Sequence, residues 1–119
     1  MSKAAAVFAS LRSHDTHAAL NAVTQLLYED EDSPYFLVQR ALLIQAADNY
    51  GHFTLEDAER DLERAHRLDP RFPPALQELA HFYDAVSPNP GKARHFAQLY
   101  LDEVSDEVAA MKGIVEAED

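Results

Sequence analysis

The chain of 119 residues contains no cysteine and only three glycines. Without cysteine it has no disulfide, no thiolate zinc site and no thiol nucleophile. The shortage of glycine argues against a fold rich in β-hairpins, because their tight turns need residues with positive φ. The remaining composition, with 47% hydrophobic and 26% charged residues, is ordinary for a globular protein, so we expect one helical domain over residues 1–119.

Basic residues are also scarce, since 10 Lys and Arg stand against 21 Asp and Glu and give a net charge of −11. A field of this sign repels phosphate backbones and anionic lipid headgroups. We therefore predict no nucleic-acid partner and no membrane partner. We expect a protein or peptide partner that is basic or amphipathic.

Long hydrophobic runs are missing as well. The run from Ala4 to Ala9 is shorter than the apolar segment of a signal peptide and far shorter than the ~20 residues of a membrane span. The simplest interpretation is a cytoplasmic location.

Capping residues and prolines divide the chain into helical segments. Ser13 or Asp15 can cap a helix that ends near the acidic residues 29–32, and Ser33-Pro34 begins another that runs to about Tyr50. This second helix is apolar on nearly all sides, which predicts a central position. Further starts are expected at Thr54, which with Asp57 forms a capping box, and at Asn89-Pro90. A short helix is expected over 3–12, and the segment 90–117 is either one long helix or two with a kink near Ser105.

The stretch from Asp57 to Tyr83 predicts two amphipathic helices of similar length, joined by a turn at Asp69-Pro70. Residues at helical spacing form the inward stripe of each helix. They are Ala58, Leu62, Ala65 and Leu68 in the first, and Leu76, Leu79, Ala80 and Tyr83 in the second.

An offset of 36 residues aligns five structural positions and indicates an internal repeat: Ala22, Leu26, Pro34, Phe36 and Leu43 match Ala58, Leu62, Pro70, Phe72 and Leu79. The small-large-small pattern of Ala58, Leu62 and Ala65 before Pro70 resembles the tetratricopeptide repeat (TPR) family, whose unit is a helix-turn-helix of 34 residues. The best match covers 54–86, while Arg40 stands where that family has a large residue. The resemblance implies an all-α, right-handed superhelix of six to seven helices with a C-terminal capping helix at about 90–117.

In that family the first helices of the repeats line a concave groove that grips peptides. Carried over to this chain, the resemblance implies a polar, acidic binding surface made of Gln45, Asp48, Asn49, Gln77, His81 and Asp84. The predicted function is a protein-interaction module for a basic or amphipathic segment. A dedicated inhibitor or chaperone, of the immunity-protein or secretion-chaperone kind, is the alternative. One tight and salt-sensitive partner would favour that alternative, whereas weak binding of several peptides would favour the adaptor.

Catalytic and cofactor signatures do not occur. There is no Gly-rich phosphate loop, nucleophile elbow or HExxH helix, so we predict a non-enzyme without a cofactor. His14 and His17 lack a third metal ligand at suitable spacing, and His66 is predicted to be a surface residue. In the last helix the apolar residues from Val108 to Val115 extend beyond what the core needs, and they predict a contact patch for a second copy or for a partner helix.

Overall fold

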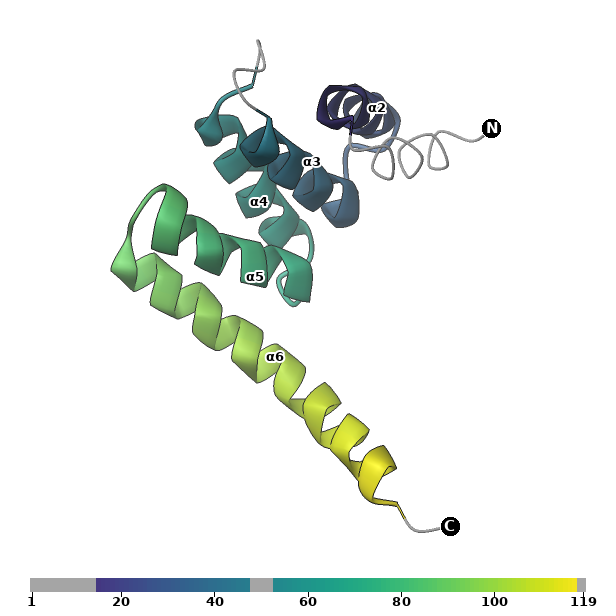
Figure 1. Cartoon of the computed structure of the whole chain (residues 1–119), viewed down its shortest axis with the longest axis vertical. Coiled ribbons are helices and arrows are strands. Elements are labelled where there is room, and N and C mark those ends of the chain that lie inside the picture. The colour runs from purple at the N-terminus through teal and green to yellow at the C-terminus, as the bar shows by residue number, and fades with distance from the viewer. Residues whose placement is uncertain (1–14, 48–52, 118–119) are drawn as a thin grey trace. The chain divides into compact units, whose positions relative to one another are not determined.

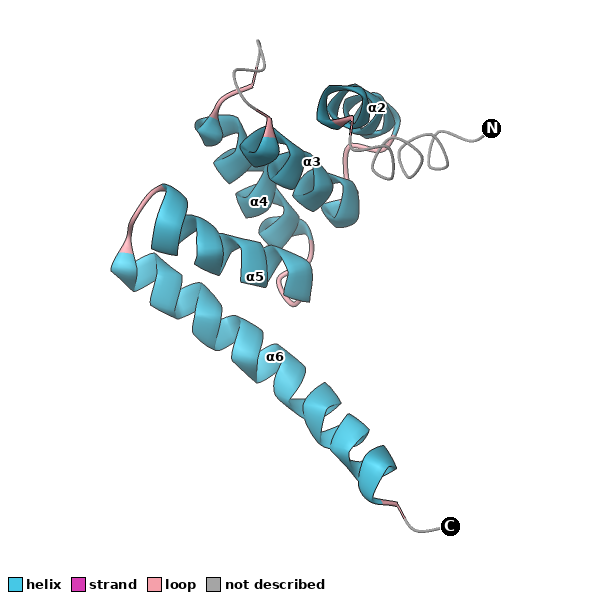
Figure 2. Cartoon of the chain, viewed as in Figure 1, coloured by secondary structure: helices cyan, strands magenta, loops and turns pink. Residues whose placement is uncertain are grey.

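A computed structural model describes residues 15–47 and 53–117, and this part of the chain contains five α-helices, one π-helical turn and no strand (Figures 1 and 2). The all-α prediction is confirmed. The helix expected over 3–12 lies outside the described residues. The chain forms two compact units, Met1–Pro70 and Arg71–Asp119, which are considered one at a time below. The elements are α2 (Thr16–Glu29), α3 (Pro34–Ala46), α4 (Leu55–Leu68), α5 (Pro73–His81), the π-turn (Phe82–Val86) and α6 (Pro90–Glu116).

In the first unit α3 packs against both α2 and α4, as its apolar surface predicts (Figure 1). Its residues Leu37, Val38 and Ala41 are buried, and Leu20 and Val23 of α2 are completely buried. An apolar side chain of this size contributes roughly 1.5–3 kcal/mol when it is fully buried. The core of the first unit therefore forms around α3, which ends at Ala46 rather than near Tyr50.

The predicted helix starts are confirmed by their caps. Asp15 accepts a hydrogen bond from the Ala18 N–H, and Ser33 accepts one from the Phe36 N–H. Thr54 and Asp57 form the expected capping box, in which each side chain accepts from the other residue's backbone N–H. These contacts satisfy N–H groups that the first turn of a helix leaves without intrahelical partners.

The inward face of α4 differs from the prediction at one position. Ala58, Leu62 and Ala65 are completely buried, but Leu68 is 40% exposed and Asp61 is buried instead. A helix advances about 100° per residue, which places Leu68 at the edge of the stripe that the other three define. The buried face of α4 thus carries a carboxylate that the apolar pattern did not predict.

The second unit is built on α5 and α6, which pack against each other. Leu76 and Leu79 of α5 are buried, and Tyr83 stacks on Phe96 of α6 with ring centroids 6.0 Å apart. With nine residues, α5 is shorter than the fourteen-residue α4, but it continues without a break into the five-residue π-turn. The helical segment therefore ends at Val86, and a hydrogen bond of 2.9 Å from the Ser87 N–H to the Phe82 carbonyl fixes this end.

The segment predicted at about 90–117 is one helix of 27 residues without a break at Ser105. The Ser105 hydroxyl donates to the Asp102 carbonyl at 2.9 Å within the helix. Phe96 is the only buried residue of α6, and each residue from 105 to 117 is exposed. Neither α6 nor any shorter helix in 15–47 or 53–117 combines the length and hydrophobicity needed to cross a bilayer.

The two halves of the predicted repeat differ where the sequence matched them. Pro34 is the first residue of α3, whereas Pro70 lies in the turn and α5 begins at Pro73. The aligned prolines therefore serve different local structures, and the spacing of 36 residues does not place the following helix starts in equivalent positions.

Candidate functional site

A hollow of about 430 Å³ lies within the second unit, between the end of α5, the π-turn and the start of α6. Three alanines and a proline give it an apolar floor, and three ionisable side chains surround the floor. The lining residues are Ala80, His81, Asp84, Pro90, Ala93, Arg94 and Ala97. Small side chains on neighbouring helices allow another backbone to approach closely, so the floor suits a helix or an extended segment.

The polar groups of the hollow are available for binding. His81 and Asp84 come from α5 and the π-turn, and Arg94 faces them from α6; all three are exposed. None of the three side chains makes a hydrogen bond or an ion pair with any residue in the described part of the chain. Asp84 and Arg94 thus line one hollow without pairing with each other, which leaves a carboxylate and a guanidinium free for a partner.

The π-turn fixes the position of Asp84. One extra residue per turn widens the helix, and the Asn89 N–H reaches back to the Tyr83 carbonyl at 2.8 Å to close the segment. π-turns in α-helices occur frequently at functional sites. The sequence signalled the break with its two prolines after Val86, but not the widened turn before it.

The structure brings together two of the six predicted binding residues, His81 and Asp84. Gln77 is exposed on α5 but does not line the hollow. Gln45 belongs to the first unit and is half-buried, with its amide donating to the Ala41 carbonyl at 3.1 Å, so its side chain supports its own helix. Asp48 and Asn49 lie outside the described residues.

Arg94 is the lining residue that the sequence reasoning missed. Its signal in the sequence is its position four residues after Pro90 and next to Ala93, in the first turns of the last helix. The resemblance to tetratricopeptide repeats places the groove residues on the preceding helix and not at this position.

A second surface of the same unit is an apolar strip on α6, which we call the α6 stripe: Leu101, Val104, Val108, Met111 and Val115. Val104 is half-buried and the other four are 47–84% exposed. A hollow of about 500 Å³ runs along one side of this stripe and is flanked by Glu107, Lys112 and Glu116. The exposed patch predicted for Val108–Val115 is therefore present, and it begins earlier than predicted.

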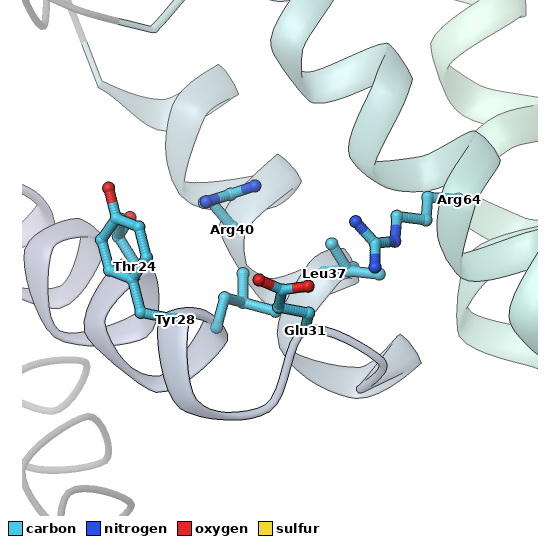
Figure 3. A pocket seen from close by; sticks show the side chains of 7 residues that line it. Thr24, Tyr28, Glu31, Leu37, Arg40 and Arg64 are labelled. Atoms are coloured by element: carbon cyan, nitrogen blue, oxygen red, sulfur yellow. The ribbon is translucent and has the colours of Figure 1, made fainter.

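The first unit contains a smaller pocket of about 230 Å³, which Figure 3 shows from close by. Thr24 and Tyr28 of α2 line it, together with Glu31 from the following loop, and Arg40 and Arg64 reach it from α3 and α4. The buried Thr24 hydroxyl has no hydrogen-bond partner among the described residues.

Ion pairs already occupy the arginines of that pocket. Arg40 donates two hydrogen bonds to Asp61, at 2.7 and 2.8 Å, and Arg64 pairs with Asp32 at 3.1 Å. The hydrogen bonds that Arg40 donates to Asp61 raise the pKa of Arg40; burial opposes this rise, and the negative charge of Asp61 adds to it. These arginines hold α3, α4 and the loop after α2 together, so we assign the pocket a structural role.

Metal binding finds no support in this part of the chain: residues 15–47 and 53–117 contain no group of three or more His, Asp or Glu side chains placed to share an ion. His66, predicted to be a surface residue, is half-buried, and its Nδ1 atom is inaccessible to solvent.

Comparison of the chain with protein-family models, with curated proteins and with solved structures found no match.

Proposed function

We propose that this chain is a non-enzymatic protein-interaction module that binds a basic, amphipathic segment of a partner protein in the hollow between α5 and α6. One observation carries the proposal: His81, Asp84 and Arg94 surround an apolar floor and are paired with no described residue. Charged groups at an interface contribute most when a partner supplies opposite charges as it excludes water.

The chemistry of the hollow defines the partner. Asp84 accepts hydrogen bonds from a lysine or arginine, and Arg94 can hold a carboxylate with two parallel bonds. The floor of Ala80, Ala93 and Ala97 accepts the apolar side of the same segment at short range. The net charge of −11 favours a partner that is basic as a whole and accelerates its approach.

We also propose that the helix pairs α3–α4 and α5–α6 are tetratricopeptide-like units of a right-handed superhelix. Two features support this arrangement: each pair packs within its own unit, and the small-large-small face of Ala58, Leu62 and Ala65 is completely buried. Residual dipolar couplings would give the angle between α4 and α5. An angle outside the range of tetratricopeptide repeats would rule the superhelix out and would leave the hollow unaffected.

Calorimetric titration with two synthetic peptides tests the binding proposal. Both are amphipathic 18-residue helices with the same Ala and Leu face, and their polar faces carry either lysine or glutamate. We expect the lysine peptide to bind and the glutamate peptide to bind much more weakly, because the net charge of −11 repels it and only Arg94 can pair with its carboxylates. Equal binding of the two, or binding of neither, would contradict the proposed chemistry.

Two variants that remove one negative charge each distinguish a direct contact in the hollow from the effect of the net negative charge on peptide binding. Asp84→Asn removes the carboxylate of the hollow and should weaken binding of the lysine peptide about fivefold or more. Asp106→Asn removes an exposed carboxylate of α6 outside the hollow, and its effect should stay below about twofold. Equal effects would show that only net charge matters. A third variant, Ala97→Gln, fills the floor and should abolish binding.

A further inference from the structure

The C-terminal half of α6 has no neighbour in the described chain. Every residue from 105 to 117 is exposed, so nothing packs on the last three turns of this helix. Helices shorter than about 12–15 residues are marginal in water unless an apolar face is packed. An apolar face is present here as the α6 stripe, and its residues share one side of the helix.

We propose that the α6 stripe pairs with the α6 stripe of a second copy of this chain, as a short parallel coiled coil. Leu101, Val104, Val108, Met111 and Val115 are spaced 3, 4, 3 and 4 residues apart, which is the a and d pattern of a coiled-coil seam. In this register Leu101, Val108 and Val115 take the a positions. A β-branched residue at a, here valine in two of three positions, favours two-stranded pairing.

The charged residues beside the stripe identify the second copy and its direction. Glu107 takes a g position and Lys112 the following e position, and both flank the stripe. A parallel, in-register pair brings g of one chain opposite the next e of the other, which gives two symmetric pairs between Glu107 and Lys112 of different chains. In an antiparallel pair Glu107 faces Ile114 and Lys112 faces Ser105, so no opposite charges meet.

The other acidic residues of this segment do not obstruct pairing. Asp102 and Asp106 take b and f positions, which point away from a coiled-coil partner, whereas Glu116, also at a b position, flanks the stripe four residues after Lys112. Glu103 is held by Arg71 within the second unit at 3.0 Å. Repulsion between the outward carboxylates acts over more than a Debye length at physiological salt, so it opposes pairing only weakly.

Pairing of two α6 helices would also affect the hollow between α5 and α6. The pairing does not depend on the proposed function, but its effect on partner binding does. At about 100° per residue, Ala93 and Ala97 lie on the same side of α6 as the stripe. The α6 helix of a parallel second copy would therefore run along the side of the hollow. Self-pairing and partner binding should therefore compete. In the dimer the hollow is covered, and the chain binds its partner only after the dimer dissociates.

The size of the seam sets the strength of the dimer. Two heptads bury an area at the low end of specific interfaces, so we expect a dissociation constant on the order of 10 to 100 µM. Sedimentation equilibrium of the whole chain should show a mass that rises from 13.3 kDa towards twice that value across this range. A mass that stays at that of the monomer up to about 1 mM would overturn the proposal.

Charge-reversal variants test the predicted register. Glu107→Lys or Lys112→Glu alone should weaken the dimer about tenfold, and the double variant should restore it. Met111→Lys should abolish pairing, whereas Ala109→Lys, which adds the same group at an outward b position, should not. All four sites are exposed, so circular dichroism of the dilute monomers should be unchanged. Single reversals without effect, or a double variant no better than the singles, would overturn the parallel register.

The absence of native cysteine permits a direct test of direction. In a parallel pair each seam residue faces its own counterpart, so Met111→Cys and Val104→Cys should each form a disulfide-linked dimer in a glutathione buffer. Asp106→Cys, at an outward position, is the control and should not. Crosslinks that appear only when Val108→Cys and Met111→Cys chains are mixed would show antiparallel pairing and contradict the proposal.

Discussion

Replacing Arg40 by methionine tests how much the ion pair between α3 and α4 contributes to the first unit. Arg40→Met keeps most of the apolar stem of the side chain and removes both hydrogen bonds to Asp61, at 2.7 and 2.8 Å. Asp61, only 8% exposed, is then left as a buried carboxylate without its cation. Removing one partner of a buried pair costs about 3–5 kcal/mol. Because the Arg40 side chain is 21% exposed, we expect the lower end, about 3 kcal/mol.

The matched control is Arg60→Met on α4. Arg60 pairs with Asp57, but its side chain is 75% exposed, and exposed pairs contribute at most about 0.5–1 kcal/mol. Urea unfolding followed by circular dichroism at 222 nm gives both free energies of unfolding. Equal losses for the two variants would refute the argument that burial makes the Arg40 pair important. A double variant, Arg40→Met with Asp61→Leu, should recover most of the loss, since it leaves no buried charge.

Three further predictions concern the first unit. Thr54→Ala removes the capping box of α4 and should lower the free energy of unfolding by about 1 kcal/mol in the same urea assay. The pKa of Asp57 is lowered in the folded chain, first by the Thr54 N–H, so its stabilising effect is present above the ordinary value of 3.8 and is lost as the pH falls. The stability difference between wild type and Asp57→Asn should therefore vanish on acidification; a constant difference would contradict this. Ala65→Leu overfills a completely buried position and should destabilise by about 1–3 kcal/mol, and a neutral effect would show that the packing is loose.

Local rules explain why most of the secondary structure followed from the sequence. Ser33, Thr54 and Asn89 are caps whose bonds close within three residues, so their effect does not depend on distant parts of the chain. For the same reason, the pair Asn89-Pro90 correctly predicted where α6 begins.

Features that depend on contacts between helices were not predictable in the same way. Arg40 was recognised only as a departure from a repeat pattern, because its partner Asp61 is 21 residues away and appears in the sequence as one more surface carboxylate. The π-turn, which begins at Phe82, was not predicted, because the buried side chains of Phe82 and Tyr83 also fit the apolar pattern of an ordinary α-helix.

The candidate site was predicted in part for the same reason. The resemblance to tetratricopeptide repeats implied His81 and Asp84 because both belong to one helical segment, whereas Arg94 comes from the next helix and joins them only when α5 and α6 pack. Of the exposed apolar patch on α6, the sequence predicted the C-terminal part, because an amphipathic stripe longer than its core is visible without a structure.

The central claim, that the hollow between α5 and α6 is a binding surface, is tested most directly by amide NMR of the ¹⁵N-labelled chain titrated with the lysine peptide. We predict that the largest shifts occur at His81, Asp84, Ala93 and Ala97, and that they saturate together with one dissociation constant. The same titration of Asp84→Asn should need more peptide to reach saturation. Shifts that avoid these four residues, or that are spread evenly over the acidic surface, would contradict the account.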